Sequence, residues 1–218
     1  MSLKTKKPGE YIRNLARKRE KSAKMLYFQA KAVIIATLLL FLAFGISKIG
    51  ILLLLAGLIG SYCLFRSGKH FEKRADDAKR GAQAETEVAD ILNISLSQRW
   101  QIEYNLKIKK WGDVDVVLHS PKDKWYAIDV KSHGGTKVYQ NGKLRKRYGK
   151  NIYDFKEGDL IAKVKGQAKQ VRRLKGAEWV IPMLCFTKSS IDISDDEISG
   201  VYVVTAADLV DTLLRLDK

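Results

Sequence analysis

The chain has 218 residues and a net charge of +16, because 40 Lys and Arg stand against 24 Asp and Glu. A hydrophobic share of 46% excludes a globally disordered chain, and two cysteines are too few for a disulfide scaffold. Cys63 and Cys185 both lie in apolar runs, so we expect two buried thiols in a reducing compartment. Neither these cysteines nor the three histidines have ligand-like spacing, which argues against a structural zinc site.

The strongest local feature is an apolar run at residues 32–65, which contains no Asp, Glu or Arg and only one lysine, Lys48. As a single helix the run would be about 51 Å long, whereas the core of a bilayer is ~30 Å thick. The run divides at Gly45–Gly50 into two halves that each approach the length of one span. It therefore predicts a transmembrane helical hairpin, in which Gly57 and Gly60 permit close helix approach. The alternative is the buried hairpin of a soluble protein, but neither half has the polar face of a core helix.

The flanks of this run are basic. Residues 1–31 hold ten Lys and Arg against two acidic residues, and residues 67–81 also carry an excess of basic groups. Because positive flanks stay on the cytoplasmic side, we expect both termini in the cytoplasm. The expected parts are a basic cytoplasmic N-terminal helix at 1–31, a membrane hairpin at 32–66, a basic linker helix at 67–81 and a cytoplasmic domain at 82–218. The first helix either lies on anionic headgroups or is an ordinary solvated helix.

Charge is also segregated within residues 82–218. The net charge is −2 over residues 82–130, +11 over residues 131–175 and −5 over residues 176–218. A basic block inside an otherwise acidic domain favours a polyanionic partner. The alternative is a solubilising face with no partner.

Hydrophobic periodicity predicts an α/β domain with a mixed sheet flanked by helices. We expect a hairpin with a primed turn at Val138–Arg145 around Asn141–Gly142, and a capping box that opens the last helix at Thr205. The other expected elements are helices at 82–96 and 157–175 and strands at 101–108, 113–118, 125–131, 179–186 and 201–204.

Two neighbouring strands carry the residues that suggest chemistry. Strand period places Asp113 and Asp115 on one face, and Asp129 and Lys131 on one face of the next strand. Adjacent antiparallel strands bring such side chains within about 5 Å, and a divalent cation resolves the repulsion between carboxylates. Such a metal polarises a phosphodiester, while a lysine holds the attacking water and offsets charge on the phosphate. The alternative is a surface ion pair.

The helix at 157–175 supports this site. Gln167 falls inside the apolar stripe, where an amide needs partners. It is either part of the site or a core-edge amide bonded to backbone. The apolar stripe consists of Leu160, Val164, Ala168, Val171 and Leu174, and the opposite face carries Lys165, Lys169, Arg172 and Arg173.

Four segments now resemble motifs of a known family. They are Gly81-Ala82-Gln83-Ala84-Glu85, Gly112-Asp113-Val114-Asp115-Val116-Val117, Ile128-Asp129-Val130-Lys131 and the helix residue Gln167. In this order they resemble the nuclease-related domain (NERD) family, a branch of the PD-(D/E)xK phosphodiesterase superfamily with the restriction-endonuclease-like fold. The resemblance covers roughly Gly81–Thr187. It departs from the family pattern at Ala84, which replaces the second glycine, at Asp129, which replaces the usual Glu, and in having no Pro ahead of Gln167.

The resemblance implies specific roles. Glu85, Asp115 and Asp129 are the implied metal ligands, Lys131 the catalytic lysine and Gln167 a supporting residue. The implied cofactor is Mg²⁺, or Mn²⁺ in its place, and the implied substrate is nucleic acid. From the residues alone Glu87 competes with Glu85, and Asp113 with Asp115.

We therefore expect a multi-pass membrane protein whose cytoplasmic domain is a magnesium-dependent nuclease, a hydrolase of phosphodiester bonds in DNA. The alternative is a catalytically inactive membrane tether that binds nucleic acid or anionic lipid. The residues expected to bind nucleic acid are Lys143, Arg145, Lys146 and Arg147 beside the predicted turn, and Lys169, Arg172 and Arg173 on the helix.

Overall fold

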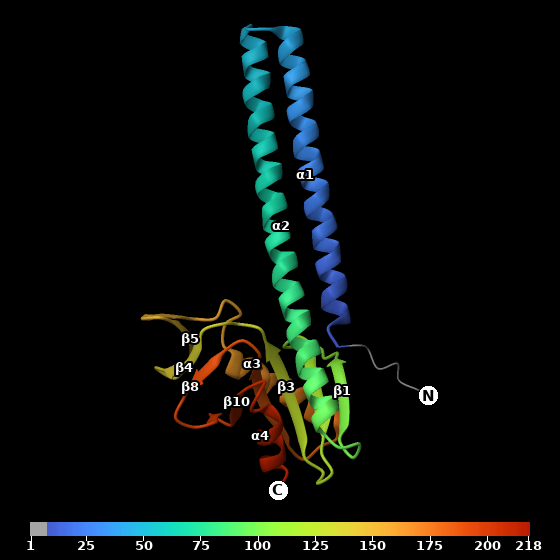
Figure 1. Cartoon of the computed structure of the whole chain (residues 1–218), viewed down its shortest axis with the longest axis vertical. Coiled ribbons are helices and arrows are strands. Elements are labelled where there is room, and N and C mark those ends of the chain that lie inside the picture. The colour runs from blue at the N-terminus through green and yellow to red at the C-terminus, as the bar shows by residue number, and fades with distance from the viewer. Residues whose placement is uncertain (1–7) are drawn as a thin grey trace, which may run out of the picture. The chain divides into compact units, whose positions relative to one another are not determined.

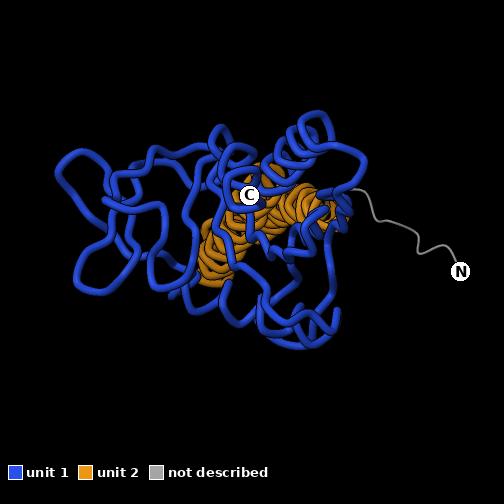
Figure 2. Tube along the Cα trace, turned by 90° about the horizontal axis from the view of Figure 1, so that it is seen from below, with its two compact units in different colours: residues 1–10, 81–218 blue, residues 11–80 orange. Residues whose placement is uncertain are grey.

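The computed structural model describes residues 8–218. It divides into two compact units, one formed by residues 11–80 and the other by residues 8–10 together with 81–218 (Figure 2). The first unit is helical, whereas all strands lie in the second. We call them the helical unit and the α/β unit.

The helical unit is an antiparallel pair built from most of α1 (Glu10–Phe44) and the first part of α2 (Lys48–Ser95), which lie side by side in Figure 1. The buried residues of α1 recur every seventh position and are small: Ala16, Ala23, Ala30 and Thr37. Ser61 Oγ donates a hydrogen bond to the Ala30 carbonyl across this seam. At Gly57 an added Cβ would lie 1.9 Å from Thr37 Oγ1, so only glycine permits this approach.

Both long helices meet the length and composition expected of a membrane span. Each contains an 18-residue window with a mean hydropathy of 2.0, and 11% of that window is buried. The predicted break near Gly45 is confirmed, because α1 ends at Phe44 and α2 begins at Lys48. Cys185 is buried as expected, but Cys63 is exposed on α2, which corrects the prediction of two buried thiols. An apolar neighbourhood in sequence did not bury Cys63, because most apolar side chains of these helices face outward.

The α/β unit has a six-stranded mixed sheet in the order β1-β2-β3-β7-β10-β9. Neighbours pair antiparallel except β3 with β7 and β7 with β10, which are parallel. The strands are β1 (Gln101–Leu106), β2 (Val114–His119), β3 (Trp125–Lys131), β7 (Val180–Phe186), β9 (Glu197–Ile198) and β10 (Val201–Thr205).

Helices cover both faces of this sheet. Tyr126, Ile128 and Val130 of β3 pack in one core with the end of α2, with Leu96 just after it, and with α4 (Leu209–Leu216). Ala127 of β3 packs in another core with α3 (Leu160–Lys175). The alternation along β3 therefore sends its odd-numbered residues, Asp129 and Lys131 included, toward the side of α3. This confirms the predicted mixed sheet flanked by helices.

A second sheet of four strands was not predicted. Its order is β6-β5-β4-β8, with β4 (Thr136–Gln140), β5 (Lys143–Tyr148), β6 (Asn151–Tyr153) and β8 (Ser190–Asp192). The predicted hairpin is confirmed inside it, because β4 pairs with β5 around Asn141 and Gly142, whose φ angles are +53° and +73°. These positive angles are those that a primed turn requires.

Several predicted boundaries are wrong. Strand β2 begins at Val114, so Asp113 lies before the strand and does not share a strand face with Asp115. Helix α3 begins at Leu160, because the Asp159 side chain caps it, and α4 begins at Leu209. The predicted capping pair does form hydrogen bonds, in which Thr205 Oγ1 donates to Asp208 Oδ2 and accepts from the Asp208 N–H, but Thr205 lies one turn before the helix begins. Leu174 is 60% exposed, because the burial of α3 stops at Val171.

Candidate active site

The site lies where the pairing of β2 with β3 ends. Val116 opposite Ile128 is the last pair of this ladder, and Asp115 and Asp129 follow one step further along. The backbone N–H of Val130 donates to Asp115 Oδ2 over 2.6 Å. At the end of the β2–β3 ladder the Asp115 side chain thus accepts a backbone hydrogen bond from β3. This bond fixes the carboxylate beside the strand that carries Asp129 and Lys131.

Asp129 is the centre of the site. It is 1% exposed and contacts three donors. Lys131 forms an ion pair with its Oδ2, while Lys163 Nζ and Gln167 Nε2 donate to its Oδ1 over 2.9 Å and 3.2 Å. Burial acts to raise the pKa of Asp129, but the ammonium groups of Lys131 and Lys163 outweigh it and lower that pKa. Asp129 is therefore a buried anion held by two cations and an amide.

Lys131 stays protonated for the matching reason. Burial alone would lower the pKa of its ammonium group, but the negative charges of Asp129 and Asp115 outweigh that effect and raise it. In this state Lys131 is a donor and a positive charge, not a base.

Helix α3 supplies Lys163 and Gln167, which are four residues apart and therefore lie on one face. Gln167 is fully buried, and its Nε2 also donates to the Asp113 carbonyl over 2.9 Å. The neighbouring Gly166 lets the Trp111 ring lie against α3, since an added Cβ would be 2.5 Å from that ring. Gln167 is therefore both a site residue and an amide bonded to backbone. Its Oε1 is buried without a hydrogen-bond partner among residues 8–218.

Burial distinguishes Glu85 from Glu87 on α2. Glu85 is 6% exposed, whereas Glu87 faces solvent. The backbone N–H of Gly9 donates to Glu85 Oε2 over 3.1 Å. Burial, and then the charge of Asp115, raise the pKa of Glu85 to about 8. Burial, and then the charge of Asp129, raise the pKa of Asp115 to about 7.

These carboxylates have the chemistry of a divalent-cation site. Their oxygens are hard ligands, and burial together with the charge of a neighbouring carboxylate raises the pKa values of Glu85 and Asp115, an effect that a bound cation would oppose. Within residues 8–218, however, no group of three or more His, Cys, Asp or Glu side chains is placed to hold a metal together. Magnesium is often held by one or two carboxylates plus water. Asp115 and Asp129 fit that need, and the unpaired Gln167 Oε1 is a free acceptor next to them for a water molecule.

The predicted nucleic-acid residues fall into two groups. In the second sheet Arg145 pairs with Asp154 and Arg147 with Asp192, while the Lys146 ammonium lies 5.7 Å from the Phe155 ring centre. On α3 the predicted residues Lys169, Arg172 and Arg173 are exposed, and so is Lys165, which was not among them. None of the four forms an ion pair within the described part of the chain.

Lys163 is the site residue that sequence reasoning missed. It lies in the basic block, and its position one helical turn before Gln167 was a usable signal. Gly9 was missed as well, and no local pattern links it to Glu85, which is 76 residues away.

Residues 80–187 match the sequence model of the nuclease-related domain. This segment includes Glu85, Asp115, Asp129, Lys131 and Gln167. The comparisons with curated proteins and with solved structures found no match. Through residues 80–187, the chain belongs to the nuclease-related domain (NERD) family.

Proposed function

We propose that this chain is a membrane-anchored, magnesium-dependent nuclease that hydrolyses phosphodiester bonds of DNA at the cytoplasmic face of a membrane. The observation that carries the proposal is the buried Asp129, which contacts Lys131, Lys163 and Gln167 beside the Asp115 carboxylate. An ordinary surface ion pair, the alternative interpretation, would leave Asp129 exposed to solvent, whereas Asp129 is buried. A cluster of opposite charges beside a carboxylate fits the handling of a phosphodiester and its water.

Each residue has a role that its environment supports. Asp115 and Asp129 would hold the cation, with Glu85 as an outer carboxylate that orients water. When bound, a divalent cation supplies Lewis-acid polarisation of the scissile phosphate. Lys131, kept protonated, offsets the negative charge that develops on the phosphate. Lys163 and Gln167 hold Asp129 in place from α3, and the Gln167 Oε1 would accept a hydrogen bond from the attacking water and so orient it.

The remaining parts of the chain fit a nuclease on a membrane. The net charge of +11 over residues 131–175 supports binding to a phosphate backbone. The two apolar helices and their basic flanks support an anchor with both termini in the cytoplasm.

The second candidate is an inactive tether for nucleic acid or anionic lipid. It is favoured by one observation, namely that both oxygens of Asp129 already contact lysine ammonium groups. A cation would have to share this carboxylate with them.

Cleavage of labelled DNA by the full chain in phosphatidylcholine nanodiscs decides between the two. We expect turnover that needs Mg²⁺ or Mn²⁺ and stops in Lys131→Ala, while the matched control Lys188→Ala, at an exposed lysine, cleaves like the parent. A parent protein that binds DNA but does not cleave it in either metal would establish the tether instead.

A further inference from the structure

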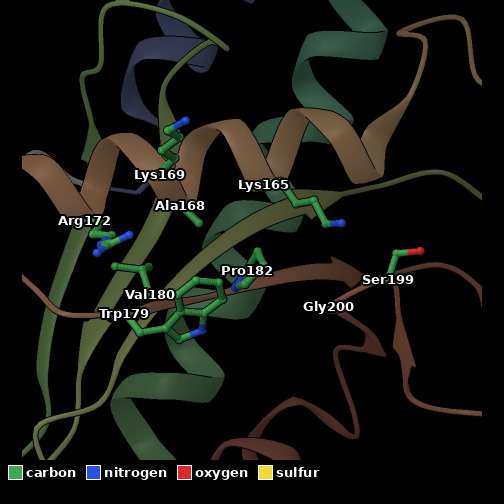
Figure 3. A pocket seen from close by; sticks show the side chains of 9 residues that line it. All are labelled: Lys165, Ala168, Lys169, Arg172, Trp179, Val180, Pro182, Ser199 and Gly200. Carbon is green, nitrogen blue, oxygen red and sulfur yellow. The ribbon is translucent and has the colours of Figure 1, made fainter.

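A pocket of about 360 Å³ lies in the α/β unit, away from the residues of the candidate active site (Figure 3). Its walls come from α3, from the start of β7 and from the Ser199–Gly200 turn between β9 and β10. A volume of this size is at the lower end of the range for small-molecule sites, which is about 300–1,000 Å³. It is large enough for one aromatic ring with its polar substituents.

One wall of the pocket is cationic. Lys165, Lys169 and Arg172 line it, and none of them forms an ion pair with any residue of the described chain, 8–218. They differ in this from the arginines of β5, which are paired with Asp154 and Asp192. Three uncompensated cations beside a pocket favour an anionic occupant.

The opposite wall is aromatic and apolar. Trp179 is 64% exposed, and Figure 3 shows its indole below α3, between Arg172 at one end and Lys165 at the other. Val180 and Pro182 line the pocket next to it. A large indole left exposed against an apolar floor is a surface on which a planar ring stacks, which is how proteins hold unpaired bases.

This pocket is separate from the candidate active site. The three cations lie roughly 180–240° around α3 from Lys163 at 100° per residue, so they point to the other side of the helix. Along the sheet, Val180 pairs with Trp125, which precedes Asp129 by four residues or roughly 13 Å. A strand held in this pocket therefore does not compete with the catalytic groups for space.

We infer that this pocket binds one unpaired nucleotide of a single-stranded nucleic acid, with the base stacked on Trp179 and the adjacent phosphates held by Lys165, Lys169 and Arg172. The combination of ring surface and cations matches the two parts of a nucleotide. A duplex keeps both faces of each base stacked, so only an unpaired base offers a face to the indole. This inference rests on the proposed function, because it takes nucleic acid as the partner. It adds that the pocket holds single-stranded nucleic acid at a place separate from the cleavage site.

Binding of a fluorescent oligothymidylate of about 12 nucleotides to the full chain, in phosphatidylcholine nanodiscs with EDTA, tests the inference. Trp179→Ala should weaken binding about 5- to 150-fold, whereas Trp179→Phe, which keeps a stacking ring, should retain most of the affinity. The triple change Lys165→Gln, Lys169→Gln and Arg172→Gln should lower the salt slope by about two units, at ~0.7 per contact. Affinity for a blunt duplex should change much less with Trp179→Ala than affinity for the single strand.

Three outcomes would overturn the inference. One is single-strand binding that Trp179→Ala leaves unchanged, and a second is equal losses for duplex and single strand. The third is binding of free thymidine monophosphate or inorganic phosphate in the pocket, together with oligonucleotide binding that does not change in Trp179→Ala. The pocket would then be a site for a small anion. Asp129→Asn separates this inference from the proposed nuclease, because it should abolish cleavage and leave oligonucleotide binding at the pocket intact.

Discussion

Asp129→Asn is the change that tests the candidate site most directly. The substitution keeps the shape of the side chain but removes its negative charge. Lys131 and Lys163 then lose their shared counter-ion, while Gln167 keeps an oxygen to which it can donate. The change therefore acts on charge far more than on packing.

The size of the effect follows from burial. Removing one partner of a buried ion pair costs about 3–5 kcal/mol. Two features reduce the cost here. The Lys163 side chain is 28% exposed, so solvent compensates it in part, and Asp115 ionises more readily once the charge of Asp129 is gone. We therefore expect the unfolding free energy to fall by about 2–3 kcal/mol.

The consequences for activity are larger. Loss of a residue that supports a metal even indirectly costs 10- to 100-fold, so cleavage should fall by at least about 100-fold. DNA binding should stay the same or tighten, because repulsion of the phosphates is reduced. The assay is Mg²⁺-dependent cleavage by the full chain, with denaturant unfolding followed by near-UV circular dichroism. Asp195→Asn, at an exposed acidic residue, is the matched control. Parent-rate cleavage by Asp129→Asn, or a stability loss no larger than that of Asp195→Asn, would refute the assignment.

Four further predictions follow from the same structure. Lys163→Met should reduce the rate of cleavage by about 10-fold or more, because Asp129 loses the ammonium donor that positions it from α3. A rate equal to the parent's would show that Lys163 has no role in the site. Because the pKa values of Glu85 and Asp115 are raised, the folded protein binds more protons than the unfolded chain between about pH 4 and pH 8. These two groups therefore lower the stability of the metal-free protein as the pH rises through this window. Melting in EDTA at about pH 5 and pH 8 should therefore show a less negative pH dependence for Glu85→Gln than for the parent, and an identical dependence contradicts the assignment. Residues 32–65 should keep the full chain in the membrane pellet during alkaline carbonate extraction, and release into the soluble fraction would exclude a spanning hairpin. The four basic residues of β5 are Lys143, Arg145, Lys146 and Arg147. Changing all four to Ala should lower the salt slope of DNA binding by fewer than four units, since two of them already form ion pairs. An unchanged slope would show that this strand does not contact DNA.

Much of the site was readable from local pattern. The period of a strand is two, so Asp129 and Lys131 had to share a face wherever that strand lay. The period of a helix is 3.6, so Gln167 had to fall among the apolar residues of α3. Both predictions are confirmed, because each depends only on the geometry of one element. The break at Gly45 is confirmed for a similar reason, since glycines interrupt a run that is otherwise uniformly apolar.

Pattern failed where the outcome depends on a second element. Glu85 and Glu87 flank the apolar face of the helix at similar angles, and only the packing of α2 in the α/β unit buries one and exposes the other. Leu174 continues the apolar stripe of α3 but has no layer to cover it.

Short-range periodicity and composition are enough to specify the apolar hairpin, the mixed α/β architecture and the strand that carries an aspartate and a lysine on one face. Which groups meet in the site depends instead on tertiary packing. Lys163 reaches Asp129 from another element, Gly9 reaches Glu85 from the start of the chain, and Trp179 joins three cations of α3 around one pocket. Contacts of this kind join residues far apart along the chain, and no local period specifies them.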